Sequence, residues 1–160
     1  MSKSKKLALR EAQQKRGPGG FVALPFALLR SQSFAALGPH SVKLLFDLLH
    51  QYNLRNNGDL SMSFEKVMKP RGWKSKDTLN QARQELLECG FIILTRQGGL
   101  HQCSLYAVTF FAIDHCEGKI DVSATRSPLG LWSKNDPVRI RSSSTPVVLK
   151  RQHLGTPAVL

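Results

Sequence analysis

Cationic and amide side chains gather between residues 66 and 84, and their types suit contact with a nucleic acid. The cations fall within eleven residues that contain no acid: Lys66, Lys69, Arg71, Lys74 and Lys76. Amide side chains follow at Asn80, Gln81 and Gln84. Asparagine and glutamine form paired hydrogen bonds with the edge of adenine, and lysine reaches phosphate or guanine. This stretch therefore combines groups that read bases with groups that hold the phosphate backbone.

The segment GWKSKDTLNQARQELLECGF (residues 72–91) predicts an amphipathic helix that carries these amides. At 3.6 residues per turn, one face is apolar and consists of Leu79, Ala82, Leu86 and Leu87. The opposite face carries Lys74, Asp77, Gln81, Gln84 and Glu88, with Asn80 at its edge. We expect Ser75 to cap the start of the helix and Gly90 to end it.

The first half of such a helix is the part that enters a major groove. We therefore expect DNA contacts from Lys74, Ser75, Lys76, Asn80, Gln81 and Gln84, and contacts to the DNA backbone from Lys66, Lys69 and Arg71. The alternative is an ordinary solvated helix face.

Two β-rich runs, FIILT and CSLYAVTFF, follow the helix and are joined by RQGGLHQ, which predicts a β-hairpin. We expect Gly98 and Gly99 to supply positive φ at its turn. The tip residues expected to touch DNA are Arg96, Gln97, Gly98 and Gly99, with His101 and Gln102 beside them. A plain solvated turn is the alternative.

The elements that must hold this helix come earlier in the chain. We expect a short helix over residues 26–30, a turn over 34–37, and a stronger helix in PHSVKLLFDLLHQYN from residue 39. A very short strand at residues 60–62 and a helix capped by Ser63 and stopped by Pro70 and Gly72 come next. The expected core is Leu45, Leu49, Tyr52, Leu79, Leu86 and Phe91, and Trp73 should pack between the helices.

This order of elements predicts an α+β fold, a winged helix-turn-helix with a three-helix core and a two-stranded hairpin as its wing. Residues 21–112 would form this domain, residues 1–20 a flexible basic arm, and residues 113–160 a mostly disordered basic tail. The segments LPFALLRSQSFAALGPHSVKLLFDLLHQYNLRNNGDLSMS, RGWKSKDTLNQARQELLECGFI, TRQGG and CSLYAVT resemble the winged-helix domain of plasmid and phage replication-initiator proteins and related mobile-element proteins of proteobacteria. The resemblance covers roughly residues 21–110 and implies DNA binding. Nothing after it looks like a second winged helix, an ATPase or a nuclease, which favours a small accessory binder or regulator.

Charge and composition agree with a polyanionic partner. The 160 residues carry a net charge of +12 and the pI is about 10.1, so nucleic acid is the first expectation and an acidic membrane surface the second. No apolar run is long enough to span a membrane.

Cys89, Cys103 and Cys116 are too scattered for a disulfide framework, and we expect a cytoplasmic protein with reduced cysteines. The basic ends add candidate phosphate contacts at Lys3, Lys5, Lys6, Arg10, Lys15, Arg16, Arg139, Arg141, Lys150 and Arg151.

Catalytic and metal-binding patterns are not found. The histidines and cysteines at His101, Cys103, His115 and Cys116 do not have the spacing of a metal module, and no nucleophile–base set or phosphate loop is present. We predict a protein that is not an enzyme, has no cofactor, and binds double-stranded DNA sequence-specifically as a replication-associated or transcriptional regulatory protein of a plasmid, phage or integrated element. Two alternatives are a winged helix that docks on replication or transcription machinery and an RNA-binding basic protein. Candidate protein partners are a component of that machinery and a second copy of the chain.

Overall fold

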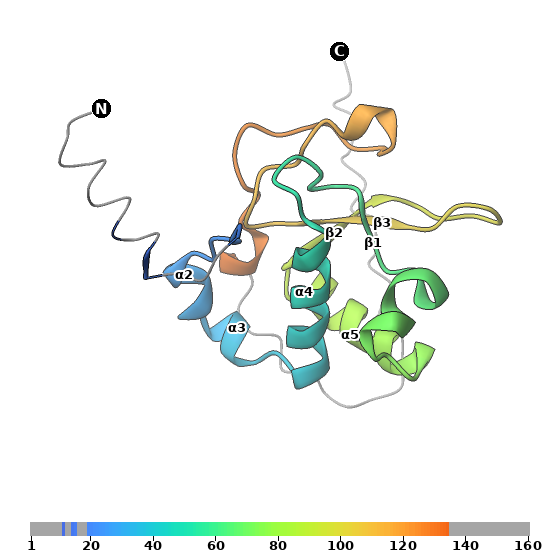
Figure 1. Cartoon of the computed structure of the whole chain (residues 1–160), viewed down its shortest axis with the longest axis horizontal. Helices are drawn as coiled ribbons and strands as arrows, with labels where there is room; N and C mark the ends of the chain where they lie inside the picture. Colours follow the sequence, from blue (N-terminus) through green and yellow to red (C-terminus); the bar gives the residue numbers. More distant parts are fainter. Residues whose placement is uncertain (1–10, 12–13, 16–18, 135–160) are drawn as a thin grey trace, which may run out of the picture.

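The chain folds into an α+β structure with a three-stranded antiparallel sheet (Figure 1). The computed structural model describes residues 11, 14–15 and 19–134. The helices are α2 (Phe26–Leu29), α3 (Gln32–Ala35), α4 (Pro39–Gln51) and α5 (Lys76–Glu88), and the strands are β1 (Leu60–Ser61), β2 (Ile92–Arg96) and β3 (Leu105–Val108). Short helical turns lie at Phe64–Met68, Lys69–Arg71, Cys116–Gly118 and Leu131–Ser133. The strand order is β1-β3-β2, so the hairpin partner β3 lies in the middle of the sheet.

The hydrophobic core forms where α4 and α5 pack together and against the sheet. Of the expected core, Leu45, Leu49, Leu79, Leu86 and Phe91 are all buried. Burying a leucine or phenylalanine side chain contributes roughly 1.5–3 kcal/mol. Tyr52 lies at the edge of the core, where its half-buried ring stacks on Phe111 with ring centroids 4.9 Å apart. The period of the apolar residues therefore predicts these core positions of the two long helices correctly.

The expected helix after Ser63 takes a different form. Ser63 makes no side-chain cap, and its carbonyl instead accepts hydrogen bonds from the N–H groups of Val67 (2.9 Å) and Met68 (3.1 Å). The second of these bonds spans five residues, which widens the turn into a π-helix. Pro70 has no N–H to continue the ladder, and Gly72 ends the segment with φ of 85°. The stop is confirmed and the cap is wrong.

Both predicted ends of α5 are confirmed. The Ser75 hydroxyl accepts a hydrogen bond from the N–H of Thr78 (3.3 Å), as an N-cap does. Gly90 has φ of 75°, and the N–H of Phe91 donates to the Leu86 carbonyl at 2.9 Å. This left-handed residue turns the chain from the helix into β2.

The predicted hairpin is present, but its glycines have another function. Neither Gly98 nor Gly99 has a positive φ, so that prediction is wrong. The turn instead closes between Gly99 and Gln102, whose N–H groups each donate to the other's carbonyl. A Cβ atom on Gly98 would lie 2.6 Å from the Ser104 backbone nitrogen, closer than atoms can approach. Glycine is needed at 98 because the two arms of the hairpin meet there.

Residues 113–134, which we call the C-terminal strap, are folded onto the domain and correct the prediction of a disordered tail from residue 113. The buried side chain of Asn57 donates to the carbonyls of Val108 (3.0 Å) and Ala112 (2.8 Å) and accepts from the Val108 N–H (2.9 Å). The carboxylate of Asp114 accepts from the Asn57 N–H at 2.8 Å. Composition missed this segment because backbone groups and one asparagine hold it, not apolar periodicity. The rest of the predicted tail, residues 135–160, and most of the basic arm lie outside the described residues.

The end of the strap reaches the opposite side of the molecule from the hairpin. The Ser33 hydroxyl in α3 donates to the Trp132 carbonyl at 3.0 Å, and the Trp132 side chain packs against the core. The strap therefore connects the sheet edge to the N-terminal helices, and it accounts for a tryptophan that the sequence pattern does not explain.

Candidate nucleic-acid interface

The outer face of α5 is a row of exposed polar side chains. Its inner face buries Leu79, Ala82 and Leu86. Its exposed residues are Lys74 and Lys76 around the first turn, then Asp77, Asn80, Gln81 and Gln84. Within the part of the chain that the structure describes, the side chains of Lys74, Gln81 and Gln84 make no hydrogen bond or ion pair. Their donors and acceptors are therefore available to a ligand.

The lysines before and at the start of α5 share one acidic neighbour. Glu65 accepts from Lys69 at 3.0 Å and lies 3.9 Å from the Lys76 ammonium group. All three side chains are more than 60% exposed, so these pairs are screened and weak. Lys66 is exposed as well. The face therefore keeps a positive balance at the places where phosphate contacts are predicted.

Arg71 is tied into the fold through a buried carboxylate. Asp47 of α4 is 3% exposed and accepts from Lys43 Nζ (2.6 Å), Arg71 Nε (2.5 Å) and Trp73 Nε1 (2.7 Å). Burial on its own would raise the pKa of Asp47, but the hydrogen bonds from Lys43, Trp73 and Arg71 and the charge of Lys43 outweigh it and lower the pKa. This cluster, which confirms Trp73 as a packing residue, joins α4 to the turn before α5.

We predicted Arg71 as a contact to the DNA backbone, and the structure pairs it with Asp47. Arg71 and Asp47 are 24 positions apart, and helix or strand periodicity relates only residues close together in the sequence. The cluster could therefore not be predicted from the sequence.

The hairpin projects from the body of the molecule (Figure 1). Arg96, predicted to touch DNA, donates from its guanidinium to the carbonyls of Cys103 (3.1 Å) and Lys119 (3.1 Å). It therefore braces the hairpin against the C-terminal strap. Gln97 and Gly99 are exposed, as are His101 and Gln102. The tip also carries Leu100, which is 93% exposed and was not predicted as a site residue.

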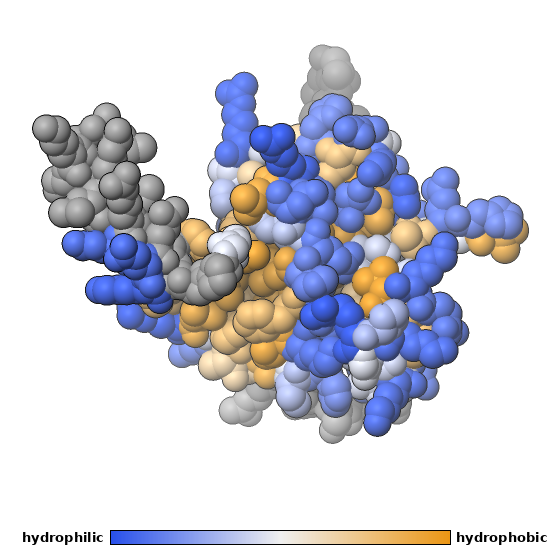
Figure 2. Space-filling model, viewed as in Figure 1, coloured by the Kyte–Doolittle hydropathy of each residue, from blue (hydrophilic) through white to orange (hydrophobic). Residues whose placement is uncertain are grey.

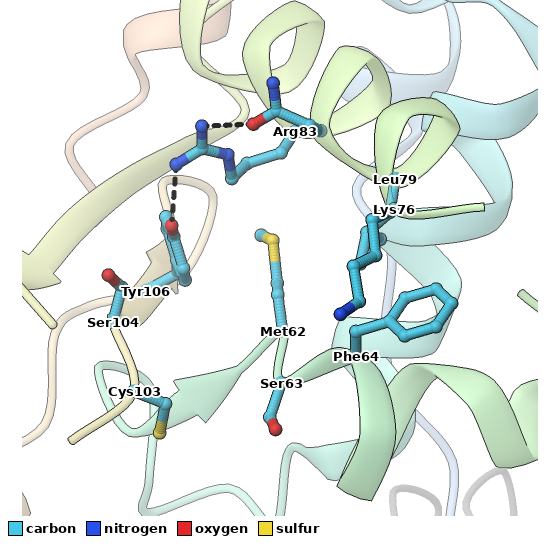
Figure 3. A pocket seen from close by; sticks show the side chains of 10 residues that line it. Met62, Ser63, Phe64, Lys76, Leu79, Arg83, Cys103, Ser104 and Tyr106 are labelled. Atoms are coloured by element: carbon cyan, nitrogen blue, oxygen red, sulfur yellow. Dashed lines mark hydrogen bonds between the residues drawn. The ribbon is translucent and has the colours of Figure 1, made fainter. Parts of the chain in front are cut away.

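A groove of about 350 Å³ separates α5 from the base of the hairpin (Figure 3). Met62, Phe64 and Leu79 form its apolar part, and the rest of its lining is Ser63, Lys76, Asn80, Arg83, Cys103, Ser104 and Tyr106. The Arg83 guanidinium lies in this groove and donates to Asn80 Oδ1 and to the Tyr106 hydroxyl (3.2 Å). Sequence reasoning missed Arg83 because its position on the helix lies beside the apolar stripe, and only the fold shows where its head group points.

The arrangement offers three kinds of group on α5 and the segments next to it. Amides on α5 and the arginine in the groove can recognise bases, lysines before and at the start of α5 can hold phosphates, and the hairpin can lie along a backbone. Within residues 11, 14–15 and 19–134, no three or more His, Cys, Asp or Glu side chains group as metal ligands would. No helix in the same residues has the length and apolar character to cross a membrane.

Comparison of the chain with models of known protein families, with curated proteins and with solved structures gave no significant match. Any assignment of function therefore depends on the geometry of the described residues and on the resemblance drawn from the sequence.

Proposed function

We propose that this chain is a winged helix-turn-helix protein that binds double-stranded DNA sequence-specifically, as a replication-associated or transcriptional regulatory protein of a plasmid, phage or integrated element. The observation that carries the proposal is the outer face of α5, where the exposed side chains of Gln81 and Gln84 make no hydrogen bond with the residues described. The same helix lines a groove with the base of the hairpin through Asn80 and Arg83. Amides that are free in this way can form paired hydrogen bonds with the edge of adenine.

The support comes from how the fold positions α5. The Asp47 cluster connects α4 to the turn that ends at Gly72. Ser75, three residues later in the chain, caps α5. The hydrogen bonds of Asp47 therefore hold the segment before α5 in place. The N-terminal end of α5 carries a partial positive charge that favours phosphate. The net charge of +12 supplies the long-range attraction that a polyanion partner needs.

The test begins with selection of bound duplexes from a random-sequence library, followed by fluorescence anisotropy titration at about 0.15 M salt. We expect an enriched site that binds at least about 1000-fold more tightly than unrelated duplex. Gln81→Ala should relax the preference, whereas Lys69→Ala and Lys76→Ala should weaken binding to all duplexes and lower the salt slope by about one each. Lys134→Ala is the matched control, because this exposed lysine follows the Leu131–Ser133 turn that contacts α3.

Two results would overturn the proposal. One is duplex binding that is unchanged by the α5 substitutions. The other is stronger binding to structured RNA than to any duplex, since a helix shaped for the major groove does not fit the deep, narrow groove of A-form RNA.

A second candidate function, docking on a replication or transcription protein, is favoured by one observation. Phe26 of α2 is 73% exposed and Phe46 of α4 is 48% exposed, and Figure 2 shows apolar surface on the side of the molecule where α2 and α3 lie. If duplex binding is absent at about 0.15 M salt while a protein from this machinery binds and Phe26→Ser abolishes that binding, this function replaces the first.

A further inference from the structure

Arg83 is held in a fixed position on the proposed DNA-binding side of the molecule. It follows Asn80 by three residues, so the two side chains are neighbours on the surface of α5. One terminal nitrogen of its guanidinium donates to Asn80 Oδ1 and the other donates to the Tyr106 hydroxyl at 3.2 Å (Figure 3). Tyr106 belongs to β3 and is 2% exposed, so this second partner is part of the rigid sheet.

The partners hold the arginine without neutralising it. An amide oxygen and a phenol hydroxyl carry no net charge, and Arg83 forms no ion pair among the residues that the structure describes. A guanidinium has five N–H donors, of which these contacts use two. The remaining donors make no hydrogen bond with the residues described, and the side chain lines an open groove.

We propose that Arg83 is a specificity-determining residue that pairs with guanine in the major groove, and that Asn80 and Tyr106 are positioning residues that aim its guanidinium. The proposal rests on the proposed DNA-binding function and deepens it. A guanidinium donates to O6 and N7 of guanine together, and this fork geometry cannot be reproduced by lysine. Holding the fork before binding reduces the conformational entropy lost when it meets the base.

This assignment changes the function of Asn80. As a direct reader, Asn80 would pair with adenine through its side-chain oxygen and nitrogen. In the structure its oxygen already accepts from Arg83, so the amide acts through the arginine. The expected base at the corresponding position of the DNA site is therefore guanine, not adenine.

The experiment compares the wild-type protein with Arg83→Lys, Tyr106→Phe and Gln84→Ala, using the selected duplex and its set of single-base variants. Arg83→Lys keeps the charge, so its affinity for unrelated duplex should stay within about threefold of wild type. Its preference for guanine at one base pair should fall by about 5-fold to 150-fold. Tyr106→Phe should reduce the preference at the same base pair and at no other, while Gln84→Ala should change a different one.

The Tyr106→Phe result separates aiming from simple structural support. Loss of a structural contact would weaken binding at all base pairs alike, whereas loss of aiming changes one. Circular dichroism melting of each variant identifies any that fail to fold, and Tyr106→Phe then provides the decisive readout if Arg83→Lys does not fold.

The outcomes distinguish this inference from the function on which it rests. If the wild type binds no duplex, both are wrong. If the wild type is sequence-specific but its base preferences are unchanged in Arg83→Lys or in a folded Tyr106→Phe, Arg83 only satisfies the tyrosine hydroxyl and this inference alone is wrong.

Discussion

The Asp47→Asn substitution tests how the turn before α5 is held in place. Asparagine has nearly the same shape as aspartate, but it lacks the charge that attracts Lys43 and Arg71. Its amide oxygen can still accept from Trp73, while its NH₂ group faces donors that it cannot satisfy. The substitution therefore removes charge-assisted hydrogen bonds without opening a cavity.

The expected loss follows from the exposure of the partners. Hydrogen bonds to a charged group contribute about 1.5–3 kcal/mol each, and breaking a buried ion pair costs about 3–5 kcal/mol. Lys43 is 42% exposed and Arg71 is 34% exposed, so solvent screens both and the lower part of this range applies. We expect Asp47→Asn to reduce the free energy of unfolding by about 2–3 kcal/mol at pH 7.

The pH dependence gives an independent check. The pKa of Asp47 is lower in the folded protein than its ordinary value of 3.8, so the folded state favours the carboxylate. The resulting stabilisation is full above the unfolded pKa and is lost as the pH falls through the lower folded pKa. The difference in unfolding free energy between wild type and Asp47→Asn should therefore shrink in acid below pH 4.

Urea unfolding at pH 7 and at about pH 3, followed by the fluorescence of Trp73 and Trp132, measures both effects. Asp121→Asn is the control, because Asp121 is exposed and its side chain forms no ion pair among the residues described. Its change should be within about 0.5 kcal/mol. Equal stability of Asp47→Asn and wild type at pH 7, or a difference that stays the same in acid, would refute the reasoning.

Three further predictions concern the backbone. Gly98→Ala should destabilise the hairpin by about 1–3 kcal/mol. Gly99→Ala should not, because a Cβ atom added there would have no other atom within 4 Å. Equal melting temperatures of the two variants would contradict this. Ser75→Ala should cost about 1 kcal/mol through loss of the cap, measured by urea unfolding, and an unchanged midpoint would count against the cap. Asn57→Ala should cost at least about 2–3 kcal/mol, because the carbonyls of Val108 and Ala112 and the N–H of Val108 lose their partner; hydrogen exchange at the Val108 amide that stays as slow as in wild type would exclude this.

The parts of the fold that follow a local rule could be predicted from the sequence. The apolar period places α4 and α5, and the Ser75 and Gly90 signals bound α5, because each depends on residues within a few positions. The π-helical turn after Ser63 could not be predicted, since one residue can start a helix with either spacing of hydrogen bonds. The strap was missed because it is held by contacts between residues far apart in the sequence, such as the Asn57 N–H that donates to the Asp114 carboxylate.

The candidate site divides in the same way. The exposed amides of α5 follow from helix geometry and lie where they were predicted. The arginines do not, because a long side chain reaches partners that its own helix or strand does not specify. Arg71 meets Asp47, Arg96 meets two carbonyls, and Arg83 meets Tyr106. The sequence therefore shows that cations are present near α5, but the fold decides which of them are available to a partner.

The C-terminal strap sets the length of the smallest piece of this chain that can fold by itself. A fragment cut after residue 112 would leave the Asn57 N–H without the Asp114 carboxylate and the Thr95 carbonyl without the N–H of Asp121, which lies 2.8 Å away. It would also uncover the part of the core on which Trp132 packs. We therefore expect the folding unit to include Trp132, and a deletion that stops at the end of the hairpin to unfold the protein as well as to abolish binding.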